Sequence, residues 1–263
     1  MSSKLQKNLT FFYKKHILFL NFEKGGFDMK LKEKILNEFQ NTPENQLIMT
    51  GSLYKEKFSN QVSEAAFSQA VSRLCRSGEI NRVSKGVYCR PKKTRFGIIP
   101  PSESEILNLF IAKNKGIVIK YNMYNSMGIT TQVPKRYIVY SSAPEEQIKQ
   151  IRNIIVHKHD LVYNNDVKTI IKTLELLHDY NNIQNINYNV FLTNIEELCK
   201  QYNESTFETV IKTIHYPKWV IAFLQEALNY YSIQNSLSKY LSALSSYKIP
   251  KMEELYAVAQ QQS

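Results

Sequence analysis

The chain has 263 residues, of which 43% are hydrophobic, and its formal net charge at pH 7 is +11. This length is sufficient for two globular domains, each with a hydrophobic core of its own. The longest apolar run near the start, residues 17–20, is far shorter than the roughly 20 residues of a membrane span, and no small-residue cleavage site follows it. We therefore expect no membrane-spanning segment, no signal peptide and no membrane partner.

The positive charge is concentrated in one part of the chain. Residues 29–100 contain 13 Lys and Arg against 6 Asp and Glu, whereas residues 101–263 contain 16 against 15. A polyanionic partner should therefore bind the N-terminal part of the chain, within residues 29–100. Cys75, Cys89 and Cys199 form no CxxC pair, and their odd number leaves one thiol over from any disulfide. We expect inert thiols in a reduced compartment, and therefore a cytoplasmic protein.

Residues 1–28 allow two interpretations. Lys24-Gly25-Gly26 can be encoded by a purine-rich ribosome-binding sequence at a suitable distance before Met29. This favours Met29 as the native start and makes residues 1–28 a non-native extension. The alternative is an additional helix that packs on the domain after it, and N-terminal sequencing of the native protein distinguishes the two.

Residues 29–97 predict a winged helix-turn-helix domain. A first amphipathic helix, ending before Pro43, is marked by apolar residues at i, i+4, i+5 and i+8, namely Leu31, Ile35, Leu36 and Phe39. A short second helix should cover residues 53–58, with Thr50 or Ser52 as its cap. The third helix should cover residues 62–76, with Ser63 as its N-cap and Gly78 as its stop.

The third helix has two different faces. Its buried side is formed by Ala66, Phe67, Ala70, Val71 and Leu74. Its outer side is short, hydrogen-bonding and cationic, with Ala65, Ser68, Gln69, Ser72, Arg73 and Arg76. Such a face fits a major groove about 12 Å wide, where Gln suits adenine and Arg suits guanine.

A basic hairpin over residues 79–90 is predicted after Gly78. Apolar residues flank Ser84-Lys85-Gly86, and Gly86 can supply the positive φ that a tight turn needs. We predict that the cations of this wing and of the residues after it contact the DNA backbone: Arg82, Lys85, Arg90, Lys92, Lys93 and Arg95. The alternative is a helix and hairpin whose charges are merely solvated.

A second domain should begin after the Pro100-Pro101 pair, near residues 97–102, because prolines end both helices and internal strands. It is expected to start as a mixed α/β unit, with a helix over residues 106–113 capped by Ser102 or Ser104 together with Glu105. Strands are predicted at residues 117–119, 137–140 and 151–157, and a short helix at 121–127. Further helices are expected at residues 166–180, 194–202, 205–214, 218–229 and 233–244, with another after Pro250 and a loop or short edge at 181–189. The predicted fold class is α+β, mostly helical.

Catalytic motifs are mostly lacking, so we expect no enzyme, no cofactor and no metal. His157 and His159 lie on one side of a predicted strand, where two imidazoles can ligate a metal, but no further ligand has motif spacing. Ordinary strand-end histidines are the favoured interpretation. Aromatic residues that can form either a core or a recognition surface, with a core favoured, are Tyr216, Trp219, Phe223, Tyr230 and Tyr231. Lys135 and Arg136 can extend a DNA footprint, but a solvated strand start is favoured.

Two blocks of the sequence resemble a known family. Residues 70–97, AVSRLCRSGEINRVSKGVYCRPKKTRFG, look like the winged domain of the AbiEi-like antitoxins of bacterial type IV toxin-antitoxin systems. Residues 116–134, GIVIKYNMYNSMGITTQVP, are similar to the segment that opens the C-terminal domain of that group, with Ile129 in place of a Leu. The resemblance covers about residues 29–160 and fades toward the C-terminus.

The resemblance implies a DNA-binding antitoxin of an abortive infection (phage defence) system. Such a protein represses its own operon through the winged domain, which binds double-stranded operator DNA and can do so as a homodimer. Residues 102–263 then counteract a nucleotidyltransferase-like toxin, and a stable complex between antitoxin and toxin is not required. It makes Thr130, Thr131 and Gln132 candidates for the antitoxin role. The alternative for these residues is a structural turn.

Two other functions remain open from the sequence. One is a one-component repressor, in which the second domain binds a small molecule and shifts the affinity for DNA. The other is a nucleic-acid-modifying enzyme with a winged targeting domain, which would need His157 and His159 for activity. An adjacent gene for a nucleotidyltransferase-like protein would favour the antitoxin.

Overall fold

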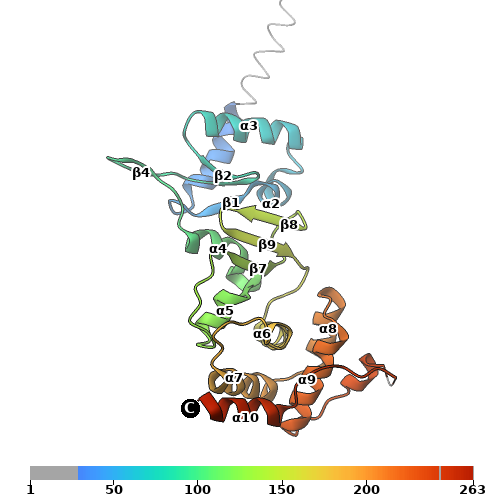
Figure 1. Ribbon diagram of the computed structural model, residues 1–263. Helices are drawn as coiled ribbons and strands as arrows, with labels where there is room; N and C mark the ends of the chain where they lie inside the picture. The colour runs from blue at the N-terminus through green and yellow to red at the C-terminus, as the bar shows by residue number, and fades with distance from the viewer. Residues whose placement is uncertain (1–28, 243, 263) are drawn as a thin grey trace, which may run out of the picture. The chain divides into compact units, whose positions relative to one another are not determined.

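The computed structural model describes residues 29–242 and 244–262, so both interpretations of residues 1–28 lie outside the described chain. The chain divides into two compact units, unit 1 ending at Ile106 and unit 2 beginning at Leu107 (Figure 1). This division falls inside α4 (Glu103–Ile111), a few residues after the proline pair. The fold class is α+β and mostly helical, as predicted. No helix in the described ranges is long and apolar enough to cross a membrane.

Unit 1 contains a winged helix-turn-helix. Its elements are a helix over residues 29–40, β1 (Leu47–Met49), α2 (Thr50–Leu53) with a π-helical turn (Tyr54–Phe58), α3 (Glu64–Arg76), β2 (Asn81–Ser84) and β3 (Val87–Cys89). The strands pair antiparallel in the order β1-β3-β2. The predicted succession of three helices and a hairpin is therefore confirmed.

The helices of unit 1 share one hydrophobic core. Its members lie at the predicted periodic positions and include Leu31, Ile35, Phe39, Phe67, Ala70, Val71 and Leu74. Each large aliphatic or aromatic side chain in such a core contributes about 1.5–3 kcal/mol by leaving water. Burial of one side of α3 therefore fixes which of its residues face solvent.

The start of α2 differs from the prediction. The helix begins at Thr50 rather than at residue 53, and its N-cap residue, Met49, makes no side-chain cap bond. Thr50 instead donates from its main-chain N and from Oγ1 to the carbonyl of Gly86, at 2.9 and 3.2 Å. The predicted capping by Thr50 or Ser52 is therefore wrong, because the Thr50 hydroxyl fastens the β2–β3 turn.

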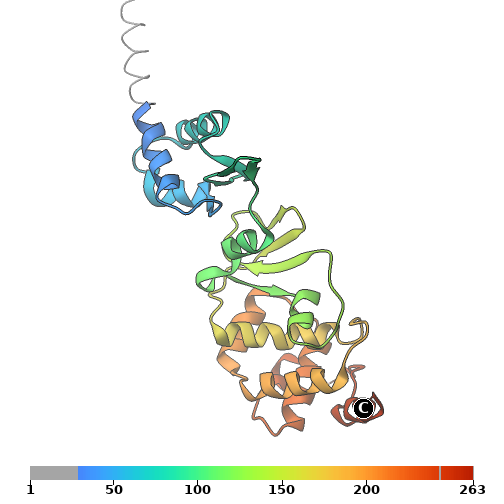
Figure 2. The same ribbon diagram turned by 90° about the vertical axis from the view of Figure 1, so that its left-hand side faces the viewer.

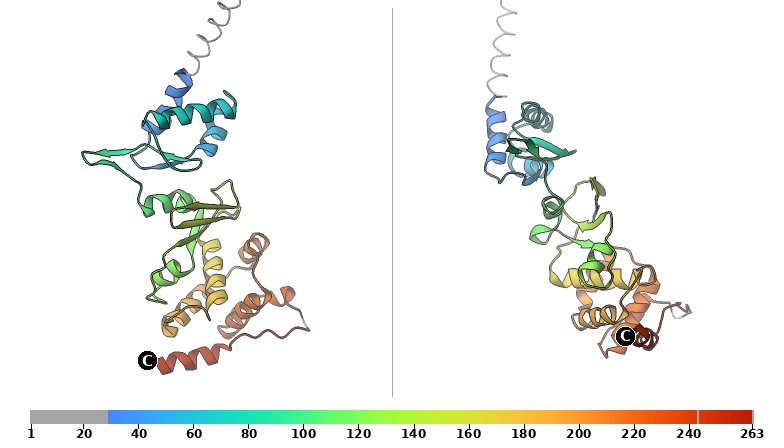
Figure 3. Two further views of the ribbon diagram at one scale, coloured as in Figure 1. Left: turned by 45° about the horizontal axis from the view of Figure 1, so that its top comes forward. Right: turned by 60° about the vertical axis from the view of Figure 1, so that its left-hand side comes forward.

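A second hairpin, which the sequence analysis did not predict, follows the wing. β4 (Lys92–Thr94) and β5 (Gly97–Ile99) pair antiparallel, with Lys92 opposite Ile99 and Lys93 opposite Ile98. Gly97 has a φ of 118°, which favours glycine. The β4–β5 hairpin projects from the sheet of unit 1 (Figure 1, Figure 3).

The sheet of unit 2 is mixed. Its strands are β6 (Gly116–Ile119), β7 (Tyr137–Ser141), β8 (Ile148–Ile151) and β9 (Ile154–Lys158), in the order β6-β7-β9-β8. β7 and β9 are parallel, and the other pairs are antiparallel. The strand predicted over residues 151–157 is present as β9, but its predicted start is wrong, because the chain turns at Arg152, where φ is 53°, and Ile151 ends β8. A helical segment, α5 (Tyr121–Ser126), follows β6 as predicted.

Helices form the rest of unit 2. They are α6 (Asn165–Asp179), α7 (Tyr188–Lys200), α8 (Glu204–Thr213), α9 (Lys218–Tyr230) and α10 (Met252–Gln262). α6 contacts β6, α7, α8 and α9, and lies between the sheet and the C-terminal helices (Figure 1, Figure 2). Asparagine side chains cap α6, α7 and α8, because Asn164, Asn187 and Asn203 each accept a main-chain N–H of the first turn.

Two helix predictions in unit 2 are wrong in extent. α7 begins at Tyr188, inside the stretch predicted as a loop. The helix predicted over residues 233–244 is reduced to a 3₁₀ turn, Leu237–Tyr240. Ser232 has a φ of 59°, and the Asn235 side chain donates to the carbonyl of Ile233 at 3.1 Å. Such local side-chain bonds compete with helical hydrogen bonds.

Candidate nucleic-acid interface

The outer face of α3 is open to solvent. Ser68, Gln69, Arg73 and Arg76 are exposed, and Ser72 is half-buried. On the opposite side of the helix, Phe67 and Leu74 are buried in the core. The predicted two-faced character of α3 is therefore present, and its polar side chains are available to a ligand of unit 1.

Both ends of α3 are held in place. At the N-terminus, Ser63 Oγ accepts from the Ala66 N–H at 3.3 Å, and Phe67 packs against the rings of Tyr54 and Phe58 at centroid distances of 5.3 and 5.2 Å. Beyond the C-terminus, Gly78 has a φ of 71°, as its predicted role as a stop requires.

A salt bridge connects the end of α3 with the first helix. Lys32 Nζ lies 2.7 Å from Glu79 Oε1, and Ser77 Oγ donates to the same carboxylate at 2.7 Å. The hydrogen bonds from Lys32 and Ser77 lower the pKa of Glu79. The outer face of α3 is thus presented by a segment whose start and end are both tied to the unit.

The wing hairpin presents two cations. Arg82 on β2 and Lys85 in the turn are exposed. Ser84 pairs with Val87, and Gly86 adopts the predicted positive φ, 71°. Because Thr50 binds the Gly86 carbonyl, the turn that presents Lys85 is anchored to the first turn of α2.

Arg90 does not have the position that we predicted for it. Its side chain is half-buried, and Nη1 donates to the main-chain carbonyl of Gln40 at 3.3 Å. The Arg90 carbonyl also accepts from the Asn45 N–H at 2.9 Å. Arg90 therefore ties β3 to the end of the helix over residues 29–40. The sequence analysis did not predict this structural contact, and the contact of Arg90 with a phosphate stays a prediction.

The remaining predicted cations lie on the β4–β5 hairpin. Lys92, Lys93 and Arg95 are exposed, and so is Phe96, of whose surface 85% is accessible. The Arg95 guanidinium carbon lies 4.6 Å from the centroid of the Phe96 ring. Prediction from sequence missed this hairpin, although a Gly after a charged and aromatic pair was a signal for a turn.

One segment of unit 1 contains basic side chains and no acidic ones. Residues 80–102 contain six Lys and Arg and no Asp or Glu. Five of these cations, all except Arg90, are exposed. Together with Arg73 and Arg76 on α3, they give unit 1 a surface whose charge is complementary to a polyanion.

The candidate antitoxin residues lie in a turn of unit 2 that is held by hydrogen bonds. Thr130 is buried, and its hydroxyl donates to the Gln184 carbonyl at 2.8 Å. The Gln132 amide donates to the Gln184 side chain, and Asn125 Nδ2 donates to the Thr130 and Gln132 carbonyls at 3.2 and 3.3 Å. Thr130 and Gln132 therefore have structural contacts, and the Thr131 side chain is exposed.

His157 and His159 pack around one aromatic ring. The Tyr140 ring lies at centroid distances of 6.2 Å from His157 and 4.7 Å from His159. Burial, together with His157, lowers the pKa of His159. The described residues contain no group of three or more His, Cys, Asp or Glu that could hold a metal ion.

A buried ionic cluster in unit 2 escaped the sequence analysis. Lys120 Nζ lies 2.7 Å from Glu175 Oε2 and 3.1 Å from Asp179 Oδ2, and only 1% of the Glu175 side chain is exposed. The hydroxyls of Tyr140 and Tyr216 donate to Glu175 Oε1 at 3.2 and 2.9 Å. Burial lowers the pKa of Lys120, but the two carboxylates outweigh it and raise that pKa overall.

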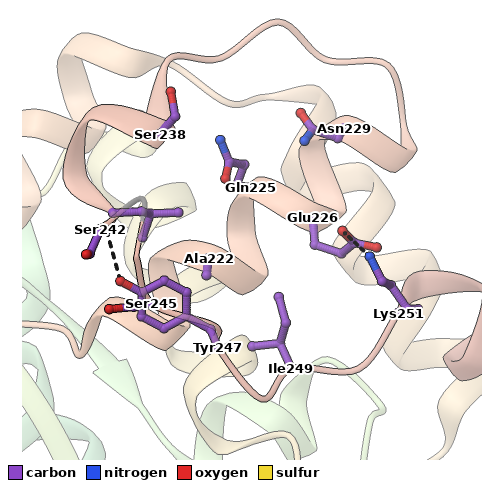
Figure 4. Close-up of a pocket in the computed structure, with 11 residues that line it drawn as sticks. Ala222, Gln225, Glu226, Asn229, Ser238, Ser242, Ser245, Tyr247, Ile249 and Lys251 are labelled. Carbon is purple, nitrogen blue, oxygen red and sulfur yellow. Dashed lines mark hydrogen bonds and ion pairs between the residues drawn. The ribbon is translucent and has the colours of Figure 1, made fainter.

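The described residues of unit 2 line cavities, of which two have a defined lining. The first, of about 490 Å³, lies between α9 and the segment that leads to α10, with Gln225, Glu226 and Asn229 on one side and Tyr247 and Ile249 on the other (Figure 4). The second, of about 440 Å³, is lined by residues of α5 and by Val133 and Pro134, at the end of the stretch 116–134 that resembles the antitoxin family.

The sequence was also compared with known proteins. Residues 34–206 match the model of DUF6088, described as a family of unknown function. No curated protein matches the chain. The matched residues run from the first helix of the winged unit to the first turn of α8, and so include α3, both hairpins and the sheet of unit 2. The chain therefore belongs to the DUF6088 family.

Proposed function

We propose that the protein is a DNA-binding transcriptional regulator that acts as the antitoxin of a type IV toxin-antitoxin (abortive infection) system. In this proposal, unit 1 binds double-stranded operator DNA and represses the operon that encodes the protein. Unit 2 counteracts a nucleotidyltransferase-like toxin. The protein acts in the cytoplasm, and its own catalysis is not required.

The observation that supports DNA binding most strongly is the exposed face of α3. An α-helix with its side chains is about 10–12 Å wide and enters a major groove of about 12 Å. Gln69 and Arg76 are exposed on that face and are suited to adenine and guanine edges. Arg82 and Lys85 on the wing are suited to the phosphates on either side of the groove.

The antitoxin role is supported by the resemblance of residues 116–134 to the start of the C-terminal domain of AbiEi-like antitoxins. In the structure this stretch comprises β6, α5 and the turn that contains Thr131. Unit 2, residues 107–263, contains 16 Lys and Arg against 13 Asp and Glu, and so carries a lower density of net positive charge than residues 29–106, with 13 against 8. A division of labour between the two units follows from the proposal.

DNA binding is tested with the full chain and a fluorescent duplex from the region upstream of its own gene. We expect binding to that duplex in preference to a scrambled one, and steep weakening with salt. If the protein binds as a homodimer, two half-sites should lie about 10 base pairs apart or a multiple of that distance. Equal affinity for both duplexes would contradict operator recognition.

The antitoxin role is tested by expressing the nucleotidyltransferase-like gene adjacent to this one. We expect growth arrest by that gene alone and recovery on co-expression of the full chain. The triple variant R76A, R82A, K85A is the control that should lose operator binding and retain the recovery. Failure of the wild-type chain to restore growth would contradict the antitoxin role.

A one-component sensor is the second candidate, and the cavity between α9 and the segment after it favours it. Its lining combines the polar groups of Gln225 and Asn229 with the apolar side chain of Ile249 (Figure 4), a mixture typical of small-molecule sites. The test compares operator affinity before and after addition of the small-molecule fraction of a bacterial extract. A change in affinity that the variant Q225A abolishes would favour the sensor.

A further inference from the structure

We infer that the β4–β5 hairpin is an arm that inserts the ring of Phe96 between base pairs of bound duplex DNA and bends the duplex. This inference rests on the proposed function, because it concerns DNA bound by unit 1. It adds a kind of contact that α3 and the wing lack, namely an exposed apolar ring at the tip of a cationic ribbon.

The tip of the arm holds Phe96 in solvent rather than against the protein. Thr94 Oγ1 donates to the Gly97 carbonyl at 3.0 Å and accepts from the Phe96 N–H at 3.3 Å. The guanidinium of Arg95 covers one face of the ring at 4.6 Å. The turn is therefore ordered by its own hydrogen bonds, and the aromatic side chain that it presents remains 85% exposed.

The charge of the arm decides which partner covers this ring. Lys92, Lys93 and Arg95 are exposed within residues 80–102, a stretch without an acidic residue. Two copies of the arm packed together would bring like charges close, which is unfavourable. A polyanion satisfies the cations and the ring at once, so the arm fits duplex DNA better than it fits a second copy of the chain.

The pairing of the strands gives both faces of the arm a mixed character. Lys93 lies opposite Ile98, and Lys92 lies opposite Ile99. Residues that lie directly opposite in an antiparallel pair share one face, so each lysine stem runs beside an isoleucine. The cations can then contact phosphates while the apolar atoms lie against the sugars at the edge of a groove.

The dimensions of the arm favour entry of its tip into a minor groove. Two strands about 4.8 Å apart, with side chains, are wider than the groove of about 6 Å. The tip alone can reach the floor, and an apolar wedge there unstacks a base step and kinks the duplex.

This geometry predicts sequence preference without hydrogen bonds to bases. Pyrimidine–purine steps such as TA and CA unstack most easily, so the DNA under the arm should contain one of them. α3 would then recognise base edges directly, while the arm would recognise how easily the neighbouring step deforms. Operators would be distinguished at a position where no polar side chain of the arm needs to contact a base.

The experiment uses the full chain and the upstream duplex, labelled at its ends with a fluorescence donor and acceptor. We expect the wild type to shorten the end-to-end distance, and to raise the fluorescence of a 2-aminopurine placed at the TA or CA step. F96A should bind about tenfold more weakly, because an aromatic stack is lost, and should leave the duplex straight. F96L should retain part of the bend, since leucine also acts as a wedge.

V133A is the matched control, because Val133 is also 85% exposed but belongs to unit 2. It should leave binding and bending unchanged, and the unfolding midpoint of F96A should equal that of the wild type. Bending by F96A equal to that of the wild type would overturn the wedge while leaving DNA binding intact. A wild-type dimer in ultracentrifugation that F96A converts to a monomer would overturn it in favour of a second copy. Failure of the wild type to bind any duplex would overturn both the wedge and the proposed function.

Discussion

Arg90 and Gln40, fifty residues apart in sequence, are joined by a hydrogen bond from the guanidinium Nη1 to the main-chain carbonyl, 3.3 Å long. The bond satisfies a carbonyl at the end of the first helix, where the last carbonyls lack helical partners. It also turns Arg90 toward the protein, whereas Arg82 on the same sheet stays exposed. Two arginines of the same basic hairpin therefore have different roles.

We predict that R90A and R82A affect different properties. R90A should lower the free energy of unfolding by about 1–2 kcal/mol, because it removes a charge-assisted hydrogen bond. R82A should leave stability unchanged, weaken DNA binding at every sequence, and lower the slope of log affinity against log salt by about one. Urea unfolding and anisotropy titrations measure the two effects.

The control for R82A is K212A, which removes an exposed cation from α8 in unit 2. It should leave the salt slope unchanged. A slope lowered equally by K212A would mean that net charge alone, and not the wing, governs the affinity.

A second prediction concerns base recognition by α3. Q69A should lose about 1–3 kcal/mol of discrimination between the operator and a duplex with one adenine position changed, because a bidentate contact to an adenine edge has that value. Affinity for the changed duplex should stay nearly constant. Competition titrations with the two duplexes measure both affinities. Equal losses of affinity for the two duplexes would show that Gln69 does not contribute to sequence recognition.

The buried cluster of unit 2 makes a prediction about stability. K120M should destabilise unit 2 by about 3–5 kcal/mol, because it leaves the buried Glu175 carboxylate without its cation. The matched control is K200A, which breaks another Lys–Glu pair of 2.7 Å, to Glu196, on the surface of α7. Calorimetry should show almost no effect for K200A. Equal melting temperatures for the two variants would contradict a structural role of the cluster.

The reactivity of the three thiols can be predicted and measured without DNA or toxin. All three cysteines are free in the described part of the chain. Burial and the nearby Glu105 raise the pKa of Cys89 to about 11, and burial raises that of Cys199 to about 12. At pH 8 we expect a disulfide reagent to modify Cys75 alone in the native protein and all three in denaturant. Rapid native labelling of C75S would show that a buried thiol is accessible.

We predict that Thr130 and Thr131 of the candidate antitoxin turn affect different properties, namely stability and neutralisation of the toxin. T130A should destabilise unit 2 by about 1 kcal/mol or more, because the Gln184 carbonyl loses a buried donor. T131A should leave stability unchanged, since this side chain is exposed. If the turn contributes to neutralisation, T131A should weaken the recovery of growth from the toxin. Full recovery with T131A would exclude this side chain.

The winged fold was predictable because its helices are amphipathic. Burial of Ile35, Phe39 and Leu74 follows from their periodic spacing, and the caps of α3 follow from Ser63 and Gly78. The capping box of α4 was equally visible, since Ser102 and Glu105 exchange hydrogen bonds of 2.6 and 3.2 Å. Local chemistry determines these features.

Features determined by tertiary contacts were not predictable. The turn between β8 and β9 places Arg152 at a positive φ, which is uncommon for residues with a side chain. The burial of Glu175 requires Lys120 from a distant strand end, although a glutamate between Leu174 and Leu176 was a signal. The internal position of Arg90 likewise depends on Gln40.

The aromatic residues near Trp219 were interpreted correctly as mostly core. Tyr216 and Phe223 are buried, and Trp219 stacks on His178 at 5.5 Å. Tyr230 is 40% exposed and stacks on Tyr256 of α10 at 5.4 Å. Aromatic spacing in a helix therefore indicated the core, but it did not indicate which ring lies at its edge.

The salt dependence of binding to the upstream duplex tests the central claim most directly, namely that α3 and the basic hairpins of unit 1 form one DNA-binding surface. Seven exposed cations lie on these elements: Arg73, Arg76, Arg82, Lys85, Lys92, Lys93 and Arg95. If most of them contact phosphates, affinity should fall by about a hundredfold or more between roughly 50 and 200 mM salt. Affinity that stays constant over this range, or that remains in a variant with Arg76, Arg82 and Lys85 replaced by alanine, would contradict the claim.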